Sequence, residues 1–503
     1  MIKDAFELEI TTDSSAAVNA IDSFVEQLLG VGNDAQVILK AVEADPACAI
    51  ANAQAAAFYL FAGGVALTQA TSYLNTAKAN LTHANDREKL YVAAIEAWAN
   101  RDIAQAIAHH EAIADSYPRD LASLHLAQYH YRNSGNSQGM LRIAEKVFAA
   151  NRHNPYIYGM LAFGLEECHR LAEAEIYARQ AIALKRDNRW AHHALAHVLE
   201  TQGRLDEGIA LMESLSDTWE YGNPVFYGHL WWHTSLYYLD AENFAKVVEI
   251  YDRNIWGRGE KDNRREQINA IALLLRLELR GVDVGSRWQE LAAYLQPRLH
   301  EHVLAFLDLQ YIYALVRGGK NDWAAQMLKS MQTHGEKVLP YVRRTWLEVG
   351  VPAARGMIAH ARGDWERVIA QLEPVLPDLY STGGSHAQRD LFEQIYLDAL
   401  IRDRQYHKAL NVLEKRNAAR GNIPAIQREL ANTYSQLGHI DEAHQASQLA
   451  LKLSQENPRT ARKPLDLRQW RKCQRRIYSP SILIMMRIFN ISFNYICRNL
   501  PRS

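Results

Sequence analysis

Large apolar, small and turn-forming residues recur along this chain in the order expected of paired helices. The pattern is clearest at Gln427, Leu430, Ala431 and Tyr434, which precede Gly438. Small residues let two helices approach closely, large residues fill the space between hairpins, and the glycine tolerates the left-handed backbone that ends a helix. A second match runs through His192, Leu195, Ala196, Leu199, Gly203 and Gly208.

The turns between the expected helices recur at a fixed step. They begin at Arg101, Gly135, His169 and Gly203, which are evenly spaced along the chain. The step equals the period of the tetratricopeptide repeat, a pair of antiparallel helices of about 34 residues. No stretch alternates with period two over a strand length. The sequence therefore predicts an all-α fold in which tetratricopeptide-type helical hairpins stack in a right-handed superhelix, an α-solenoid.

The step lengthens in the middle of the chain. The intervals from Gly203 to Glu242 and from Gly319 to Gly363 both exceed the repeat period, which returns between Arg404 and Gly438. We therefore predict one repeat body over residues 1–458, with regular repeats at about 85–220 and 387–455 and divergent repeats between them. A solenoid of this length needs no division into separate domains, because it grows without a single enclosing core.

The net charge of −1 hides an asymmetry between the body and the C-terminal segment. Residues 459–503 hold eleven Lys or Arg and one acid, Asp466, which gives +10, so residues 1–458 carry −11. An acidic body argues against nucleic acid as a partner, because phosphate binding needs clustered basic residues.

The basic segment 459–503 is predicted to lie outside the repeat fold. Its uninterrupted apolar part, residues 482–486, is far shorter than the roughly 20 residues that a spanning helix needs. Membrane contact is therefore expected only through this tail, as a surface interaction. A poorly ordered terminus and a segment foreign to the repeat fold are the alternatives.

The four cysteines and the N-terminus bear on the compartment. Cys48, Cys168, Cys473 and Cys497 have no metal-type spacing and are too few for a disulfide framework. The first residues lack a basic region followed by an apolar run, so no secretory signal is expected. We predict a cytoplasmic protein without a cofactor.

Histidines are the residues in which chemistry is to be sought. If Gly203 is position 15 of its repeat, its first helix presents positions 5, 9 and 12 to the concave side, and these positions share one helical face. The next helix places two histidines one turn apart and turns a tryptophan the same way. The groove residues predicted in this way are His193, His197, Glu200, His229, Trp232 and His233.

A histidine pair beside a carboxylate can ligate zinc or iron, and histidine is also a general base near neutral pH. The chain has no His-Glu-x-x-His motif. The prediction is therefore that no metal is bound, with His193, His197 and His229 as the candidate ligands if one is. In the alternative, His192 and His233 are hydrogen-bonded core residues and the others contact a peptide or solvent.

A second group of polar residues follows the glycines at 383 and 384. Ser385 and Gln388 have the spacing of a capping box, so a helix is expected to begin here. Because helix N-termini attract anions, His386, Arg389 and Asp390 are candidates for an anionic or polar ligand site. Alternatively, these residues form a cap and an Arg–Asp pair that locks neighbouring hairpins.

Residues 192–200, 203–204, 229–238, 250–252 and 385–390 together resemble the tetratricopeptide repeat protein 38 family. The resemblance spans about residues 1–455 and implies a soluble helical-repeat protein whose biochemical role is not established. It adds Asp308 to the candidate ligand-binding residues. Gln310 departs from the family pattern, which carries a histidine there, and the segment after Pro458 does not resemble the family.

Two functions follow as hypotheses. The first is a binding or scaffold module whose concave groove holds a protein or peptide through His193, His197, Trp232 and Arg389. The second is a small-polar-ligand protein, or an enzyme, whose pocket forms where His197, His229 and His386 converge. Of these functions, catalysis is less favoured than binding. Proximity of these three histidines would support one shared site, and wide separation would exclude it.

Overall fold

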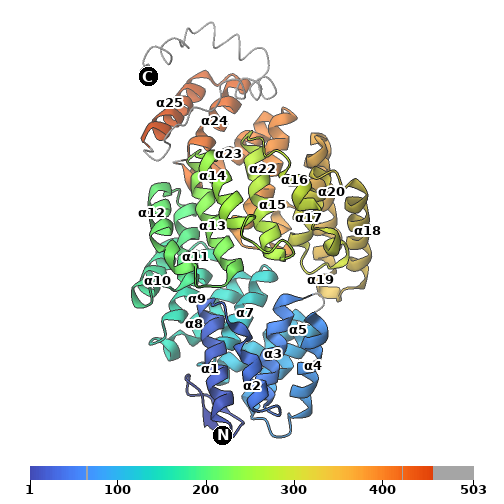
Figure 1. The fold of residues 1–503 in the computed structure, drawn as a ribbon. Helices are drawn as coiled ribbons and strands as arrows, with labels where there is room; N and C mark the ends of the chain where they lie inside the picture. The colour runs from blue at the N-terminus through green and yellow to red at the C-terminus, as the bar shows by residue number, and fades with distance from the viewer. Residues whose placement is uncertain (64–65, 422, 457–503) are drawn as a thin grey trace. The chain divides into compact units, whose positions relative to one another are not determined.

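The computed structural model describes residues 1–63, 66–421 and 423–456, and in these residues the chain is all-α (Figure 1). The only sheet in this part is a pair of two-residue strands, β1 (Ile2–Lys3) and β2 (Glu9–Ile10). Successive helices pair as antiparallel hairpins and then pack against the next pair, as α9 does with α10 and α11. The predicted helical-hairpin solenoid is confirmed.

The first half of the fold holds α1 (Ser15–Gly30), α2 (Ile38–Ala44), α3 (Ala49–Ala62), α4 (Leu67–Ala79), α5 (Asp86–Ala99), α6 (Ile103–Ser116), α7 (Leu121–Asn133), α8 (Ser137–Phe148), α9 (Pro155–Glu167), α10 (Leu171–Leu184), α11 (Arg189–Thr201) and α12 (Leu205–Leu215). The second half holds α13 (Pro224–Asp240), α14 (Phe244–Ile250), α15 (Arg264–Leu279), α16 (Arg287–Ala292), α17 (Ala305–Arg317), α18 (Asn321–Lys337), α19 (Pro340–Arg344), α20 (Val351–Arg362), α21 (Trp365–Leu372), α22 (His386–Arg402), α23 (Tyr406–Arg420), α24 (Pro424–Leu437) and α25 (Ile440–Glu456).

Short helical turns join these helices. The 3₁₀ turns are η1 (Ala35–Val37), η3 (Ala149–Asn151), η4 (Ser216–Trp219), η6 (Gln296–His300) and η8 (Leu376–Thr382). Two π-helical segments, η5 (Tyr251–Ile255) and η7 (Thr345–Gly350), lie in the divergent middle of the chain. The long predicted step from Gly319 to Gly363 is filled by α18 together with α19, η7 and α20.

In each predicted turn of the regular region, the first residue of the turn has a left-handed backbone. The φ angles of Arg101, Gly135, His169 and Gly203 are 60°, 72°, 57° and 67°. Each residue follows closely on the first helix of its hairpin and reverses the chain into the second helix. The even spacing in the sequence is therefore the spacing of one repeated turn conformation.

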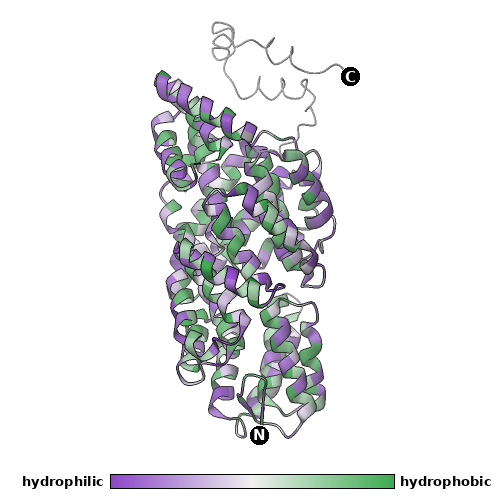
Figure 2. Cartoon of the chain, turned by 90° about the vertical axis from the view of Figure 1, so that its left-hand side faces the viewer, coloured by the Kyte–Doolittle hydropathy of each residue, from purple (hydrophilic) through white to green (hydrophobic). Residues whose placement is uncertain are grey.

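Small residues at the predicted positions let neighbouring helices interlock. A Cβ atom on Gly208 in α12 would lie 2.3 Å from the ring of Tyr237 in α13. The same tyrosine donates a 2.5 Å hydrogen bond to the carbonyl of Ala196 in α11. Green apolar and purple polar positions alternate along the helices (Figure 2), as expected where each helix buries one face.

Later helices of the body pack back against earlier ones. Nη1 of Arg101 lies 3.4 Å from the carbonyl of His302, and Gly135 lies against the backbone of Tyr380. Glu166 of α9 contacts His386 of α22. Arg420 of α23 forms a 2.5 Å ion pair with Asp240 of α13. The helices from α9 to α13 were predicted to form an open concave side. Instead, α22 and α23 cover this side.

Residues 1–457 form one compact unit. The basic segment 459–503 lies outside the described residues, so its predicted separation from the fold and its membrane contact stay predictions. No helix among the described residues is long and apolar enough to cross a membrane. Cys48 and Cys168 are free thiols, and Cys473 and Cys497 fall in the segment that is not described. The cytoplasmic location stays a prediction.

Candidate functional site

The candidate site lies where the first helices of successive hairpins, α7, α9, α11, α13 and α15, turn one face toward α22. Residues three, four or seven apart share a helical face, so each helix contributes a short column of side chains. Phe163 of α9, His193 of α11 and Phe226 of α13 are in ring contact, which shows that three of these columns meet.

Four imidazoles meet at the centre of this region, and we call them the histidine cluster: His193, His197, His229 and His233. The ring centroids of His193 lie 4.5, 5.1 and 4.9 Å from those of the other three. His386 approaches the cluster from α22, with its ring 5.3 Å from that of His197. The three histidines proposed to converge therefore do come together, and their binding role stays a prediction.

Three of the four imidazoles are almost completely buried. His193, His197 and His233 are 1%, 0% and 1% exposed, so they do not line an open groove. Burial, followed by the neighbouring imidazoles, lowers the pKa of His193 and His233 well below the ordinary value, and burial lowers the pKa of His229 to about 3. These rings are neutral at physiological pH and keep lone pairs available.

Glu166 lies between the histidine cluster and α22. Its Oε2 is 3.2 Å from Nδ1 of His197, and its Oε1 contacts Nε2 of His386. Burial alone would lower the pKa of His386, but the Glu166 carboxylate outweighs it and raises that pKa to about 9. Burial also opposes the charge on Glu166, yet His386 and His197 hold its pKa well below the usual range. Glu166 and His386 form a buried ion pair.

Asn269 of α15 fixes the other side of the cluster. Its Oδ1 lies 3.1 Å from Nδ1 of His229. Because an amide oxygen only accepts, Nδ1 of His229 must carry the proton, which leaves the lone pair on Nε2. That Nε2 faces Nε2 of His193 at 3.1 Å.

Three arginines, which we call the arginine rim, border the histidine cluster: Arg132, Arg265 and Arg389. Arg389 donates to the carbonyl of Gly384, while Arg265 is exposed. None of the three is in an ion pair with a carboxylate within the described residues. Burial first, and then the charge of Arg265, lowers the pKa of Arg132 to about 10, and Arg389 acts in the same direction. The carboxylates nearest the rim, Glu166 and Glu167, both contact His386.

The remaining residues predicted on α22 have structural partners. The capping box of Ser385 and Gln388 is present as expected. Asp390 pairs with Arg416 of α23 at 2.5 Å rather than with Arg389. The expected lock between hairpins therefore exists, but its arginine comes from the next helix.

Glu200 and Trp232 lie at the edge of the cluster. Glu200 is 3.8 Å from both Nδ1 of His233 and the guanidinium of Arg420. Trp232 is 1% exposed, stacks on His229 at 5.5 Å, and has the Arg276 guanidinium 5.3 Å from its ring centre. Neither side chain faces an open groove.

Asp308 belongs to a separate cluster. Its Oδ2 lies 2.7 Å from Nδ1 of His302, whose Nε2 is 2.7 Å from Oγ of Ser330. The chain of contacts has the order of a catalytic triad. Ser330, however, lies inside α18 and is also held by Nδ1 of His300 at 2.7 Å, where the surrounding backbone N–H groups are used by the helix. We interpret this cluster as a lock between helices. Gln310 is buried elsewhere on α17.

Sequence reasoning missed Arg132, Glu166, Glu167, Arg265 and Asn269. The repeat period contains the information needed for two of them. Arg132, Glu166 and Glu200 are separated by one repeat period each and so occupy position 12 of three consecutive repeats. Arg265 and Asn269 lie one turn apart on a helix in the stretched region, where the repeat numbering no longer applies.

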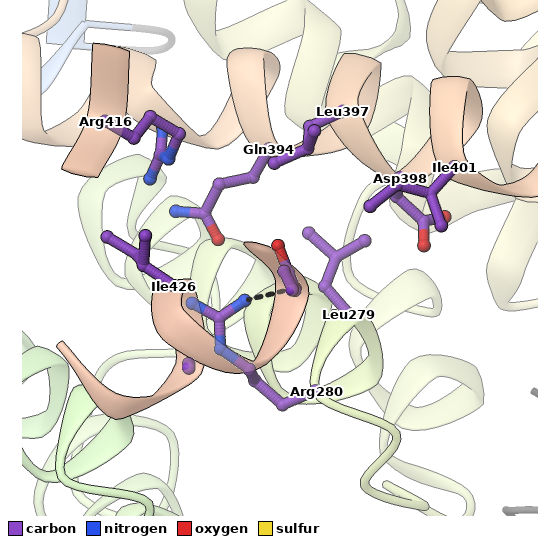
Figure 3. Close-up of a pocket in the computed structure, with 10 residues that line it drawn as sticks. Leu279, Arg280, Gln394, Leu397, Asp398, Ile401, Arg416 and Ile426 are labelled. Atoms are coloured by element: carbon purple, nitrogen blue, oxygen red, sulfur yellow. Dashed lines mark ion pairs between the residues drawn. The ribbon is translucent and has the colours of Figure 1, made fainter. Parts of the chain in front are cut away.

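The described residues also enclose a small pocket away from the histidine cluster (Figure 3). It has a volume of about 30 Å³ and lies between α15, α22, α23 and α24, with Arg280 3.9 Å from Glu429 across it. This is space for about one water molecule and not for an organic ligand.

No family model matches the chain. Among solved structures, a human IFIT1 dimer with m7Gppp-AAAA aligns over 88% of this chain and 91% of that one, with 15% identity and a TM-score of 0.37. The TPR domain of P58(IPK) aligns over 78% and 98%, with 12% identity and a TM-score of 0.22. The fold of the chain rests on its own helices, which pair as successive hairpins.

Proposed function

We propose that this chain is a member of the tetratricopeptide repeat protein 38 family that binds a small anionic ligand inside its repeat body. The motifs behind the resemblance support this proposal, because they are far apart in the sequence and yet meet in space. His193, His229 and His386 come from three of these motifs and lie within one group of ring contacts. A shared interior site accounts for such a convergence better than three independent packing requirements do.

The observation that carries the proposal is the arginine rim. Arg265 and Arg389 are both close enough to lower the pKa of Arg132, and none of the three forms an ion pair with a carboxylate among the described residues. His386 and Glu166 neutralise each other, so Glu167 alone opposes three positive charges. Like charges held together in a partly buried place destabilise one another, and a bound anion relieves the repulsion.

The ligand expected here carries a carboxylate or phosphate group. The planar guanidinium fork of arginine matches either group with two parallel hydrogen bonds. Aromatic rings flank the rim: Trp190 lies 5.0 Å from Phe226 and 5.6 Å from His125 between ring centres. These rings would cover the apolar part of an organic anion.

Macromolecular partners are the alternatives. A peptide would have to displace α22 and α23 to reach His193 and His197, so a protein partner is expected on the outer surface instead. Nucleic acid remains disfavoured as an extended partner, because residues 1–458 carry −11. The IFIT1 structures contain m7Gppp-AAAA or PPP-AAAA, so a short RNA end is included in the test below. A catalytic role remains the less favoured hypothesis.

The test measures how different anions change the melting temperature of the purified full chain. Phosphate, pyrophosphate and citrate are compared with chloride at equal ionic strength, together with tetranucleotides that end in a 5′-triphosphate or a 5′-hydroxyl. An anion present at about 100 times its Kd stabilises the folded state by about 2.7 kcal/mol. Arg132→Gln and Arg265→Gln should abolish the response.

Arg253→Gln is the matched control, because Arg253 is an exposed arginine on the outer surface, 3.3 Å from Glu249. This variant should keep the wild-type response. If every anion acts like chloride, or if the rim variants and the control respond alike, the proposed function is wrong. If only the triphosphate-ended tetranucleotide stabilises the protein, the ligand is an RNA end rather than a small molecule.

A further inference from the structure

The histidine cluster contains more buried nitrogen atoms than the surrounding protein can satisfy. Nδ1 of His193 and both ring nitrogens of His233 are buried without a hydrogen-bond partner in the described part of the chain. Each unsatisfied polar atom of this kind costs about 1–3 kcal/mol. The unpartnered nitrogens of His193 and His233 therefore destabilise the core as it stands.

Three ring nitrogens of the cluster point at one another. Nε2 of His193 lies 3.1 Å from Nε2 of His229 and 3.2 Å from Nε2 of His197. Asn269 places the proton of His229 on Nδ1, and the nearby Glu166 carboxylate favours the same tautomer of His197. His229 therefore presents an unprotonated Nε2 to Nε2 of His193, and the Glu166 carboxylate favours the same arrangement for His197.

These separations match the geometry of a metal site. Zinc–imidazole bonds of about 2.0–2.1 Å in a tetrahedron place neighbouring ligand nitrogens about 3.3–3.4 Å apart. One ligand nitrogen from each of His193, His229 and His233 lies within 4.8 Å of the others. His197 is outside that group of three, but its Nε2 lies 3.2 Å from Nε2 of His193, so a side-chain adjustment would bring it into the same coordination sphere.

We propose that His193, His197, His229 and His233 bind a divalent transition-metal ion of the zinc class. Imidazole ligands suit zinc, copper, iron and nickel, and four ligands in a buried tetrahedron are the preference of zinc. The ion uses the Nε2 atoms of His193, His197 and His229, which face one another, and Nε2 of His233, which has no hydrogen-bond partner among the described residues. This inference does not depend on the proposed anion site, which is decided by the three arginines of the rim and not by the ring nitrogens.

The surrounding groups provide the support that metal-binding histidines require. Glu166 lies beside Nδ1 of His197 and Asn269 beside Nδ1 of His229, which are the carboxylate and amide contacts that orient imidazole ligands. Glu200 lies 3.8 Å from Nδ1 of His233, which leaves Nε2 of that ring for the ion. Glu200 also places a carboxylate beside the site, whereas the charge of Glu166 is already matched by His386.

A second group of possible ligand atoms, from Glu166, Glu167, His197 and His386, lies in the same region. In that group Glu166 and His386 already satisfy each other as an ion pair. A cation bound there would have to break this pair and lie close to the arginine rim. In the histidine cluster the carboxylates Glu166 and Glu200 lie beside Nδ1 atoms, of His197 and His233, which leaves the Nε2 atoms to the cation, so the four histidines are the better site.

The experiment is metal reconstitution of the purified full chain. The protein is stripped with a chelator, incubated with Zn²⁺ or Co²⁺, separated from free metal and analysed by elemental mass spectrometry. About one equivalent per chain is expected, and the Co²⁺ form should show the intense visible bands of tetrahedral cobalt. Less than about 0.2 equivalents after reconstitution would overturn the proposal.

Variants locate the ion. His193→Gln and His229→Gln should lose it, whereas His130→Gln should keep it, because His130 is equally buried but lies outside the cluster. Asn269→Ala keeps all four ligands and should weaken binding by about 10- to 100-fold. This variant keeps the proposal testable if a ligand variant fails to fold. Full metal content and unchanged affinity in both His193→Gln and Asn269→Ala would refute the assignment.

Discussion

Glu266 is a buried carboxyl group whose ionisation should limit the stability of the protein. It is 1% exposed on α15, and its Oε2 has no hydrogen-bond partner among the described residues. It packs against the backbone of Gly228. Burial first, and then the charge of Glu260, raises its pKa to about 8. The folded protein therefore binds this proton more tightly than the unfolded chain does.

The direction of the pH dependence follows from that difference. The unfolded group titrates near 4.5 and the folded group near 8. Between these values the free energy of unfolding falls as pH rises, by about 1.4 kcal/mol per pH unit. The loss is about 3 kcal/mol at pH 7 and approaches about 5 kcal/mol at pH 8.5. It is absent below about pH 4.5.

The variant Glu266→Gln removes the ionisation and keeps the shape. It should match the wild type within about 1 kcal/mol at pH 5 and exceed its stability by about 3–5 kcal/mol at pH 8.5. At about 2.1 cal/mol/K per residue, the 457-residue body loses about 1 kcal/mol per degree. The melting temperature measured by differential scanning fluorimetry should therefore rise by about 3–5 °C at pH 8.5.

The control is Glu366→Gln on α21, which removes the same charge from an exposed side chain. Its melting temperature should follow the wild-type pH profile within about 1 °C. The reasoning about Glu266 is refuted if its variant also gives a profile parallel to the wild type between pH 5 and pH 8.5, because ionisation would then cost nothing in the folded state.

Three further predictions concern the contacts that close the body. Gly135→Ala should lower the melting temperature more than Gly438→Ala, because both glycines have positive φ but only the Cβ at 135 would lie 2.2 Å from a carbonyl oxygen, that of Tyr380. Arg416→Met should cost about 3–5 kcal/mol in a denaturant titration, since it leaves Asp390 charged and buried, and adding Asp390→Asn should restore part of the loss. Ser330→Ala should lower the free energy of unfolding by about 1–3 kcal/mol in the same assay, because the cluster around Ser330 locks helices together. Neither the wild type nor this variant should hydrolyse an ester faster than background.

The sequence was sufficient for the local part of the fold. The turns at Arg101 and His169 could be placed although neither is a glycine, because the repeat period positions them whatever their identity. The capping box at Ser385 and Gln388 could be predicted for a similar reason, since it depends on residues three apart. Hairpins form from such short-range preferences, and these are visible in the sequence.

The closure of the body could not be predicted from the sequence. His386 and Glu166 are 220 residues apart, and no periodicity links α22 to α9. Sequence reasoning therefore assigned His193 and His197 to an open concave face, where the structure has them covered. It identified four histidines correctly as neighbours on two helices, but it could not anticipate Arg265 and Asn269 from α15, because the irregular repeats have no reliable numbering.

The arrangement of charge links the two proposed sites. The histidine cluster lies between the carboxylates Glu166 and Glu200 and the arginine rim. A divalent cation on the four histidines adds positive charge beside Arg132 and Arg265, so it should strengthen anion binding, and linkage requires the anion to strengthen metal binding by the same factor. Couplings of this kind are typically about 1–3 kcal/mol. Titrating phosphate into stripped and Zn²⁺-loaded protein by calorimetry measures the factor directly. Equal phosphate affinities in the two forms would show that the two sites do not share an electrostatic environment.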